Sequence, residues 1–185
     1  MLARVSLTTA AQPTQAAVAA PQAGPAGGWR GWLGPVLMGV LAALLRLPNL
    51  GRPHALVFDE TYYAKDALAL LLFGHEMDAK KNANETLLGL DGNLDAAREI
   101  FKDSPSYVVH PPFGKWVIAA GEKVFGADPF GWRIAVCVLG ILSVVMLARI
   151  VRRMTGSNLL GTTAGFLLAI DGMAIVMSRT ALLDG

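Results

Sequence analysis

The stretch Leu56-Val57-Phe58-Asp59-Glu60-Thr61-Tyr62-Tyr63 marks the point where an apolar part of the chain gives way to an acidic part. No Asp or Glu precedes Asp59, so two adjacent carboxylates begin the acidic part. The residues before this stretch are apolar enough to cross a membrane. The stretch therefore predicts the boundary between a first membrane span and a polar segment that can carry chemistry.

The composition of the whole chain favours a membrane protein. Of its 185 residues, 54% are hydrophobic and 16% are charged, and the mean hydropathy is +0.46. The formal net charge is only +2, and no cluster of Lys and Arg is interleaved with aromatic residues, which excludes a nucleic-acid-binding protein. The single Cys137 lies in an apolar run, so no disulfide can form within the chain.

On the N-terminal side of the boundary, residues 29–50 predict transmembrane helix one. They are apolar except for Arg30 and Arg46, and about 20 such residues match the thickness of a bilayer. Arg46 lies near the end of this run, where it can anchor the helix at the headgroups or face Asp59 and hold a phosphate. Residues 1–28 are rich in Ala, Pro and Gln and predict a disordered cytoplasmic tail without a signal sequence.

On the C-terminal side, residues 51–130 predict a long extracytoplasmic loop. The segment from Asp59 to Asp128 holds twelve of the 14 acidic residues and seven basic ones, a net charge of −5. Apolar residues recur at helical spacing after Asp59 and again after Pro111-Pro112, which predicts two amphipathic helices lying against the membrane surface. The polar segment between them predicts an irregular insert with one short helix around residues 94–101.

Two further apolar runs, residues 131–153 and 158–177, predict transmembrane helices two and three. Their short connection, Arg149 to Ser157, is dense in Arg, so the positive-inside rule places it in the cytoplasm and the long loop outside. Asp171-Gly172 interrupts the third run, either as a functional Asp within a span or as a turn that ends it. Every apolar segment favours helix over strand, so the predicted fold is an all-α integral membrane protein.

Several motifs, in the same order, resemble the N-terminal third of bacterial protein O-mannosyltransferases of the actinobacterial type. They are Leu45-Arg46-Leu47, the stretch Phe58-Asp59-Glu60-Thr61-Tyr62-Tyr63, Val109-His110-Pro111-Pro112-Phe113-Gly114-Lys115-Trp116, Trp132-Arg133, and Ser178-Arg179 followed by Leu182-Leu183-Asp184. The resemblance implies the membrane helices of the GT-C class of glycosyltransferases. It also implies transfer of mannose from a polyprenyl-phosphate mannose donor to Ser or Thr of secreted proteins, at the outer face of the cell membrane.

Members of that family continue through many more membrane helices than this chain contains. Residues 178–185 are therefore expected to form an outer-side motif at which the chain is truncated. Such a chain would be a truncated product or an incomplete gene model, without transferase activity of its own.

The resemblance assigns the catalytic role to Asp59 and Glu60. A Ser or Thr hydroxyl needs a carboxylate to accept its proton, and Asp59 is the family's candidate base, with Glu60 in support. The leaving phosphate needs positive charge, which Arg side chains or a divalent metal ion could supply, although no metal ligands are assigned. The candidate substrate-binding residues are Arg46, Arg133, His110, Arg179 and Asp184. A helix-capping role for the two carboxylates is compatible with catalysis.

Two other functions stay open. Another GT-C transferase that uses a lipid-phosphate sugar to modify a glycolipid would show similar features, although the His110-Pro111-Pro112 motif favours the mannosyltransferase. A non-catalytic membrane fragment would be consistent with the stop at Gly185. The expected partners are the donor lipid, secreted acceptor proteins, membrane lipid and, as a candidate, the secretion machinery, but no nucleic acid.

Overall fold

The computed structural model describes residues 28–183, apart from the side chain of Arg30. The predicted tail up to residue 27 and the candidate site residue Asp184 lie outside the described residues. In chain order the elements are α1 (Arg30–Arg46), α2 (Glu60–Phe73), β1 (Met77–Ala79), α3 (Ala83–Leu88), the 3-10 helix η1 (Ala96–Ile100), β2 (Phe101–Pro105), α4 (Pro112–Phe125), α5 (Pro129–Thr155), α6 (Asn158–Ile170) and α7 (Gly172–Met177).

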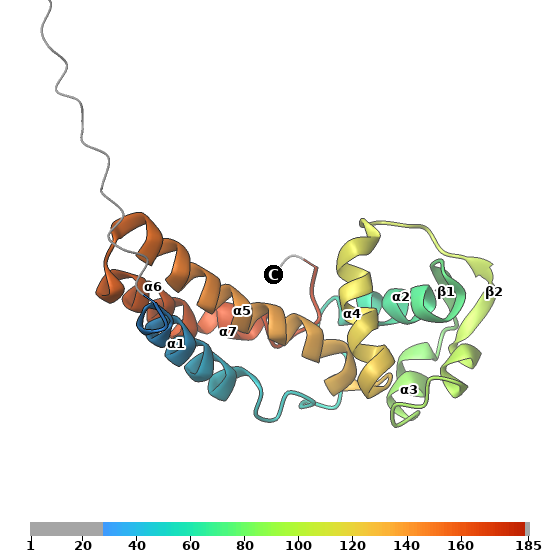
Figure 1. Ribbon diagram of the computed structural model, residues 1–185. Coiled ribbons are helices and arrows are strands. Elements are labelled where there is room, and N and C mark those ends of the chain that lie inside the picture. Colours follow the sequence, from blue (N-terminus) through green and yellow to red (C-terminus); the bar gives the residue numbers. More distant parts are fainter. Residues whose placement is uncertain (1–27, 184–185) are drawn as a thin grey trace, which may run out of the picture.

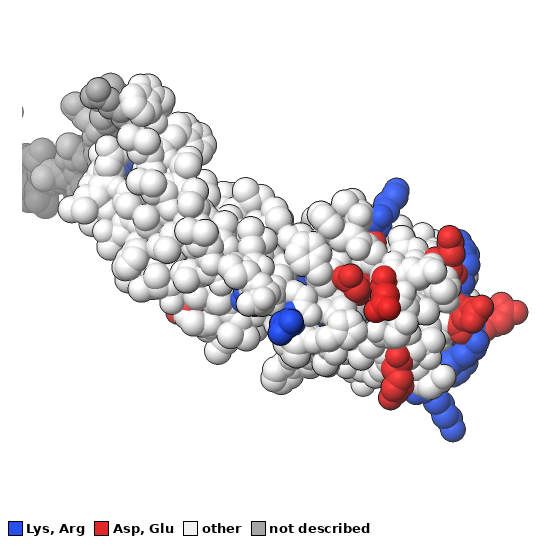
Figure 2. Space-filling model, turned by 90° about the horizontal axis from the view of Figure 1, so that it is seen from below, with Lys and Arg blue, Asp and Glu red and all other residues white. Residues whose placement is uncertain are grey.

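The molecule is elongated, and its two ends differ in character (Figure 1). Helices α1, α5, α6 and α7 form one end, and the segment from α2 to α4 forms the other. We call residues 59–128 the acidic unit. On the face drawn in Figure 2, charged side chains gather over the acidic unit, and the surface of the helical end is almost free of them.

Helix α5 connects the two ends and is the one described helix that is both long and apolar enough to cross a membrane. Its 27 residues extend about 40 Å, which exceeds the roughly 30 Å of a bilayer's hydrocarbon core. Asp128 begins the helix by accepting a hydrogen bond from the Gly131 N–H at 2.7 Å. Gly156 ends it in the left-handed conformation that glycine adopts without strain.

Helices α1 and α6 are apolar but shorter, and both pack against α5. Ala42, Val144 and Ala169, one from each helix, are buried where the three helices meet. Large apolar side chains such as Leu37 of α1 and Leu167 of α6 face outward instead. An apolar exterior around a small buried contact is what a lipid environment favours.

The third apolar run does not continue as one helix through Asp171. Helix α6 ends at Ile170, and the exposed Asp171 caps α7 by accepting a hydrogen bond from the Ala174 N–H at 2.7 Å. Of the two interpretations of Asp171, the structure supports the turn.

The mostly helical fold is confirmed, but the all-α prediction misses a small antiparallel sheet in the acidic unit. Strand β1 pairs with β2, with Met77 opposite Pro105 and Ala79 opposite Phe101. Helix α3 and η1 fill the connection between the strands, where the sequence predicted an irregular insert with one helix. The strands have three and five residues, too few to show the period-two alternation by which a strand is recognised.

The structure also corrects the predicted position of the first amphipathic helix. The apolar face of α2, expected to meet a membrane surface, packs inside the protein: Tyr63, Ala67 and Leu68 are buried in the core of the acidic unit with Ile118 of α4 and Trp132 of α5. Helix α4 has two apolar faces. One packs in this core, and the other exposes side chains, among them Phe113, Trp116 and Val124.

Candidate active site

Glu60 and Arg133 form a buried ion pair between the first residue of α2 and the second turn of α5. The guanidinium meets the carboxylate with two hydrogen bonds of 2.7 Å each, from Nε to Oε1 and from Nη2 to Oε2. Glu60 is 0% exposed and Arg133 is 1% exposed. Paired, bidentate contacts of this kind are the strong form of a charge-assisted hydrogen bond.

Every N–H of the Arg133 guanidinium is engaged. Beyond Glu60, its Nη1 donates to the carbonyls of Leu50 and Pro53 at 3.2 and 3.1 Å, and Nη2 donates to Ala55 at 2.8 Å. A guanidinium has five N–H groups, and these contacts together with the two to Glu60 use all of them. In this arrangement Arg133 holds the connection between α1 and α2 and has no donor left for a phosphate.

Glu60 joins three separate parts of the chain. Besides Arg133, its Oε2 accepts a hydrogen bond from the Val57 N–H and its Oε1 accepts one from the Ala181 N–H, both at 2.9 Å. The segment that follows α7 is therefore tied to the start of α2. The sequence placed these segments in one site by resemblance, and the structure shows which atoms join them.

Asp59, the neighbour of Glu60, has the opposite environment. Its side chain is exposed and makes no helix-capping hydrogen bond, because only its carbonyl accepts the Tyr62 and Tyr63 N–H groups, at 2.8 and 2.9 Å. Within residues 28–183 its carboxylate takes part in no ion pair. The capping role considered for its side chain is therefore absent, and the carboxylate is exposed to solvent.

The residue that precedes Asp59 has an unusual backbone conformation. Phe58 has φ +51°, a left-handed conformation that costs a residue with a side chain about 1–3 kcal/mol. Its ring is 81% exposed, so no burial of the ring offsets this cost. Strain of this kind next to an unpaired carboxylate is typical of functional sites. Sequence reasoning missed this feature, because nothing in the residue type predicts a positive φ.

Arg46, at the end of α1, is buried against the third apolar segment. Its Nε donates to Ser178 Oγ at 3.0 Å, Nη1 to the Ala169 carbonyl at 2.8 Å and Nη2 to the Leu168 carbonyl at 3.2 Å. Two of its five N–H groups therefore remain without a partner among these contacts. Ser178 was quoted in a sequence motif but was not named as a site residue, and its position beside Arg179 was the only signal for it.

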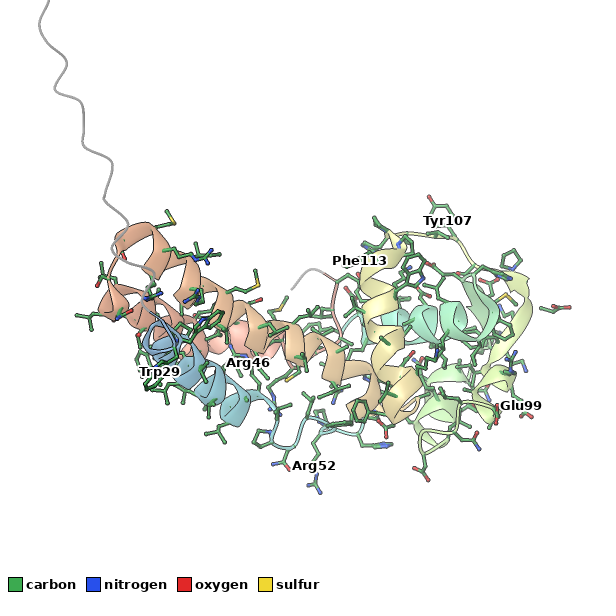
Figure 3. All side chains as sticks on the ribbon, viewed as in Figure 1. Trp29, Arg46, Arg52, Glu99, Tyr107 and Phe113 are labelled. Carbon is green, nitrogen blue, oxygen red and sulfur yellow. The ribbon has the colours of Figure 1, made fainter. Side chains whose placement is uncertain are left out.

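Arg46 and Ser178 line a cavity of about 370 Å³ between α4, α5 and α7. Figure 3 shows Arg46 at the end of α1 and Phe113 at the start of α4, which also lines the cavity. The rest of the lining is largely apolar and includes Val117, Leu139, Met177, Leu182 and Leu183. An apolar cavity with a guanidinium in its wall suits an amphiphile that has an anionic head.

Arg179 and His110 hold other parts of the site together. Arg179 donates to the carbonyls at the end of α1 and beyond, those of Arg46, of Pro48 at 3.0 Å and of Asn49 at 3.3 Å. A cation at this position also complements the dipole of α1. The ring of His110 packs edge-on against Tyr63 of α2, with the ring centroids 5.4 Å apart.

A second buried ionic cluster, which the sequence did not predict, lies within the acidic unit. The Lys115 ammonium is 0% exposed and lies 2.7 Å from Glu76 and 2.9 Å from Asp66. Burial lowers the Lys115 pKa, but hydrogen bonds to the two carboxylates outweigh this and raise it overall. Lys115 thus ties α4 to α2 and to the segment before β1.

Among the described residues, no group of three or more His, Cys, Asp and Glu is arranged to hold a metal ion. The acidic residues that lie close together, such as Asp66 and Glu76, are engaged by Lys115.

Fold and site together define a class: a mostly helical protein, with a helix able to cross a membrane, that carries a carboxylate site beside the start of that helix. The model of the family described as dolichyl-phosphate-mannose-protein mannosyltransferase matches residues 36–185, so the chain belongs to that family. This confirms the resemblance that the sequence motifs indicated.

Named relatives are found in actinobacteria. A polyprenol-phosphate-mannose–protein mannosyltransferase of Mycobacterium tuberculosis is 39% identical over 167 residues, which cover 88% of this chain and 27% of that protein. Proteins of the same name are 38% identical in Mycolicibacterium smegmatis, over 89% of this chain and 28% of the relative, and 33% identical in Corynebacterium glutamicum, over 80% and 26%. The chain thus spans about a quarter of the length of these relatives. No solved structure matches it.

Proposed function

We propose that this chain carries the catalytic base and part of the donor site of a polyprenyl-phosphate-mannose–protein mannosyltransferase. The observation that carries the proposal is the contrast between two adjacent carboxylates. Glu60 is buried and fully engaged, whereas Asp59 is exposed and has no ion pair among the described residues. A base needs an unengaged oxygen within reach of substrate. The names of the relatives supply the donor and the acceptor class.

In the proposed reaction, the hydroxyl oxygen of an acceptor Ser or Thr forms a bond to the anomeric carbon of mannose. The bond from that carbon to the phosphate oxygen breaks, and the polyprenyl phosphate leaves with the bonding electrons. The hydroxyl proton passes to the carboxylate of Asp59. A single displacement with one carboxylate and no covalent intermediate inverts the anomeric centre.

Arg46 is the proposed contact for the donor phosphate. Three of its N–H groups hold it against Ser178, Ala169 and Leu168, and the two that remain can donate to phosphate oxygens. The apolar cavity beside it has room for the first part of the polyprenyl chain. Arg133 and Arg179 position the site, since their donors are occupied by Glu60 and by backbone carbonyls.

The proposed enzyme is a multi-pass protein of the cell membrane with a GT-C-like arrangement of helices. The Arg residues near the end of α5 support a cytoplasmic position for residues 149–157 and for the N-terminus. The acidic unit and the Glu60 site then face outward, where they meet Ser and Thr residues of proteins that leave the secretion machinery.

The Asp59→Asn variant of the full-length enzyme tests the base. Asn keeps the shape of Asp but cannot accept the proton, so the initial rate of mannosyl transfer in membranes should fall roughly 10²–10⁴-fold. Asp103→Asn is the matched control, because Asp103 is also an exposed acid of the acidic unit. The assay uses polyprenyl-phosphate mannose and a Ser/Thr peptide. A near-normal rate for Asp59→Asn would remove Asp59 from the mechanism, and transfer to a glycolipid in place of the peptide would favour the alternative transferase.

The Arg46→Lys variant tests the donor site. A lysine keeps the charge but loses the planar fork, so the KM for the donor should rise about tenfold while the KM for the peptide stays constant. Arg52→Lys is the control, since Arg52 is exposed just beyond α1. Unchanged donor KM in Arg46→Lys would place the phosphate elsewhere.

A further inference from the structure

The end of α5 that lies far from the Glu60 site carries three arginines without acidic partners. Arg152 and Arg153 follow Arg149 by three and four residues, about one helical turn, so each is a neighbour of Arg149 on the helix surface. None of them forms an ion pair with a described residue. The sequence holds no Asp or Glu at residues 1–58 or 129–170, so neither the tail nor the adjoining helices can supply a carboxylate.

Two of these arginines are held in place by their surroundings. The guanidinium of Arg149 lies over the Trp32 ring, 3.7 Å from its centroid, and Nη1 donates to the Gly31 carbonyl at 3.3 Å. Arg152 donates from Nε to Asn158 Oδ1. Its side chain packs closely against glycines of both α1 and α6. A Cβ would lie 2.5 Å from Arg152 Cζ at Gly31 and 2.6 Å from Arg152 Cβ at Gly161.

Among residues 28–183, most N–H donors of the three guanidiniums have no hydrogen-bond partner. Each guanidinium has five N–H groups, and the structure gives one hydrogen bond to Arg149, one to Arg152 and none to Arg153. About 30 Å of helix separates Pro129 from Arg149, which equals the hydrocarbon thickness of a bilayer. If α5 crosses a membrane with the Glu60 site at one face, these donors reach the depth of the headgroups in the opposite leaflet.

We propose that Arg149, Arg152 and Arg153 form a binding site for the phosphate of an anionic phospholipid headgroup. Phosphate oxygens supply the acceptors and the negative charge that this end of the protein lacks. The glycines at positions 31 and 161 let the site form between three helices, so a bound lipid links α1 to α5 and α6.

Native mass spectrometry of the purified full chain tests the site, with phosphatidylglycerol and phosphatidylcholine added separately. The chain should bind phosphatidylglycerol in preference. Arg153→Gln should weaken this binding about fivefold, the effect of one basic residue on attraction to an anionic lipid. Arg153 is exposed and makes no contact that folding needs, so the variant keeps the fold. The variant with all three arginines changed to Gln should lose the preference.

Arg98→Gln is the matched control, because Arg98 also lies over an aromatic ring, 5.3 Å from the centroid of Phe73, but in the acidic unit. It should bind phosphatidylglycerol as the unmodified chain does. Equal binding of the two lipids, or a preference that survives the Arg→Gln changes, would overturn the proposal. So would displacement of the lipid by an equal concentration of inorganic phosphate, which would indicate a site for the free anion. The readout is lipid binding, so its failure would leave the Asp59 mechanism untouched.

Discussion

Asp59 and Glu60 are neighbours in the chain, but their carboxylates lie in different surroundings. Glu60 accepts hydrogen bonds from Arg133, Val57 and Ala181 inside the protein, whereas Asp59 is exposed. Substituting only one partner of a buried carboxylate–guanidinium pair lowers the stability of the fold, because the other charge then stays buried without a partner. The two residues therefore differ in what their substitution tests.

Glu60→Gln is expected to destabilise the fold. It leaves the charge of Arg133 buried and uncompensated, so the free energy of unfolding should fall by about 3–5 kcal/mol. Asp59→Asn should change it by less than about 0.5 kcal/mol, because the side chain is exposed and makes no contact that the substitution breaks. Thermal unfolding in detergent, followed by circular dichroism, measures both. An equal Tm for the two variants would mean that the ion pair does not stabilise the fold.

At the scale of the element, α4 contains a buried carboxyl group that has no hydrogen-bond partner among the described residues. Glu122 is 0% exposed, and neither of its carboxyl oxygens has a hydrogen-bond partner among the described residues. Burial raises the pKa of Glu122 well above its usual value of 4.5. The group is therefore protonated in the folded protein at pH values where it is ionised in the unfolded chain.

This shift predicts how stability depends on pH. The folded state binds more protons than the unfolded state between pH 4.5 and the raised pKa, so stability is highest below pH 4.5 and falls as pH rises through this window. The contribution of one such group falls by at most about 1.4 kcal/mol per pH unit. Glu122→Gln removes the ionisable group, so its Tm should exceed that of the unmodified chain at pH 8 and change less between pH 5 and 8. The exposed Glu99→Gln is the control, and identical pH profiles for both variants would refute the role of burial.

Contacts between α5 and α6 depend on a glycine. A Cβ at Gly161 would lie 2.6 Å from the Ala148 carbonyl oxygen and 2.6 Å from Arg152 Cβ, closer than real Cβ atoms approach. A Cβ at Gly172 would meet nothing within 4 Å. The two glycines therefore form a matched pair for substitution.

Gly161→Ala should force α6 away from α5 at a cost of about 1–3 kcal/mol, because an added methyl group in a packed contact causes strain. Gly172→Ala should leave the Tm nearly unchanged. The Tm in detergent, together with the elution profile in size-exclusion chromatography, distinguishes them. A Tm for Gly161→Ala equal to that of Gly172→Ala would show that the two helices do not pack as closely as described.

At the scale of the whole molecule, the site is assembled from segments that are far apart in the chain. Arg46 meets Ser178, Glu60 meets Arg133 and Ala181, and Arg179 meets the carbonyls that follow α1. The end of α1 and the start of α5 both lie toward the acidic unit in Figure 1, and the start of α1 and the end of α5 lie at the opposite end. One orientation of the molecule therefore puts the site and the arginines of α5 on opposite sides of a membrane.

Cysteine labelling tests that orientation. In a Cys137→Ala background, Lys102→Cys should react with an impermeant thiol reagent in intact cells, and Ser157→Cys should react only after permeabilisation. Lys102 lies exposed on β2 and Ser157 lies between α5 and α6, so the two positions report on opposite ends of α5. Cys137 is buried, so its replacement should not alter the labelling of either position. Labelling of Ser157→Cys alone in intact cells would invert the proposed orientation.

The sequence by itself determined where the apolar runs begin and end, where the acidic unit lies and to which family the chain belongs. The hydrophobicity, length and charge of a segment depend only on residues that are close in sequence, so they can be determined before the tertiary structure is known. The helical spacing of apolar residues, also a local property, predicted a helix after Asp59 and another after Pro111-Pro112. Both are present, as α2 and α4. The β1–β2 pair was missed because its strands are held together by pairing across about 25 residues, not by a local pattern.

Only the tertiary structure decided what each charged residue of the site does. Asp59 and Glu60 are both acidic and adjacent in the chain, and Arg46 and Arg133 each lie near an end of an apolar helix. The sequence alone therefore does not distinguish the contacts of the two residues within either pair. Arg133 is fully engaged by Glu60 and by carbonyls about 80 residues away, whereas Arg46 keeps two free donors beside an apolar cavity. The number of free N–H donors on each guanidinium depends on hydrogen-bond partners from distant segments of the chain. A local sequence pattern cannot predict those partners.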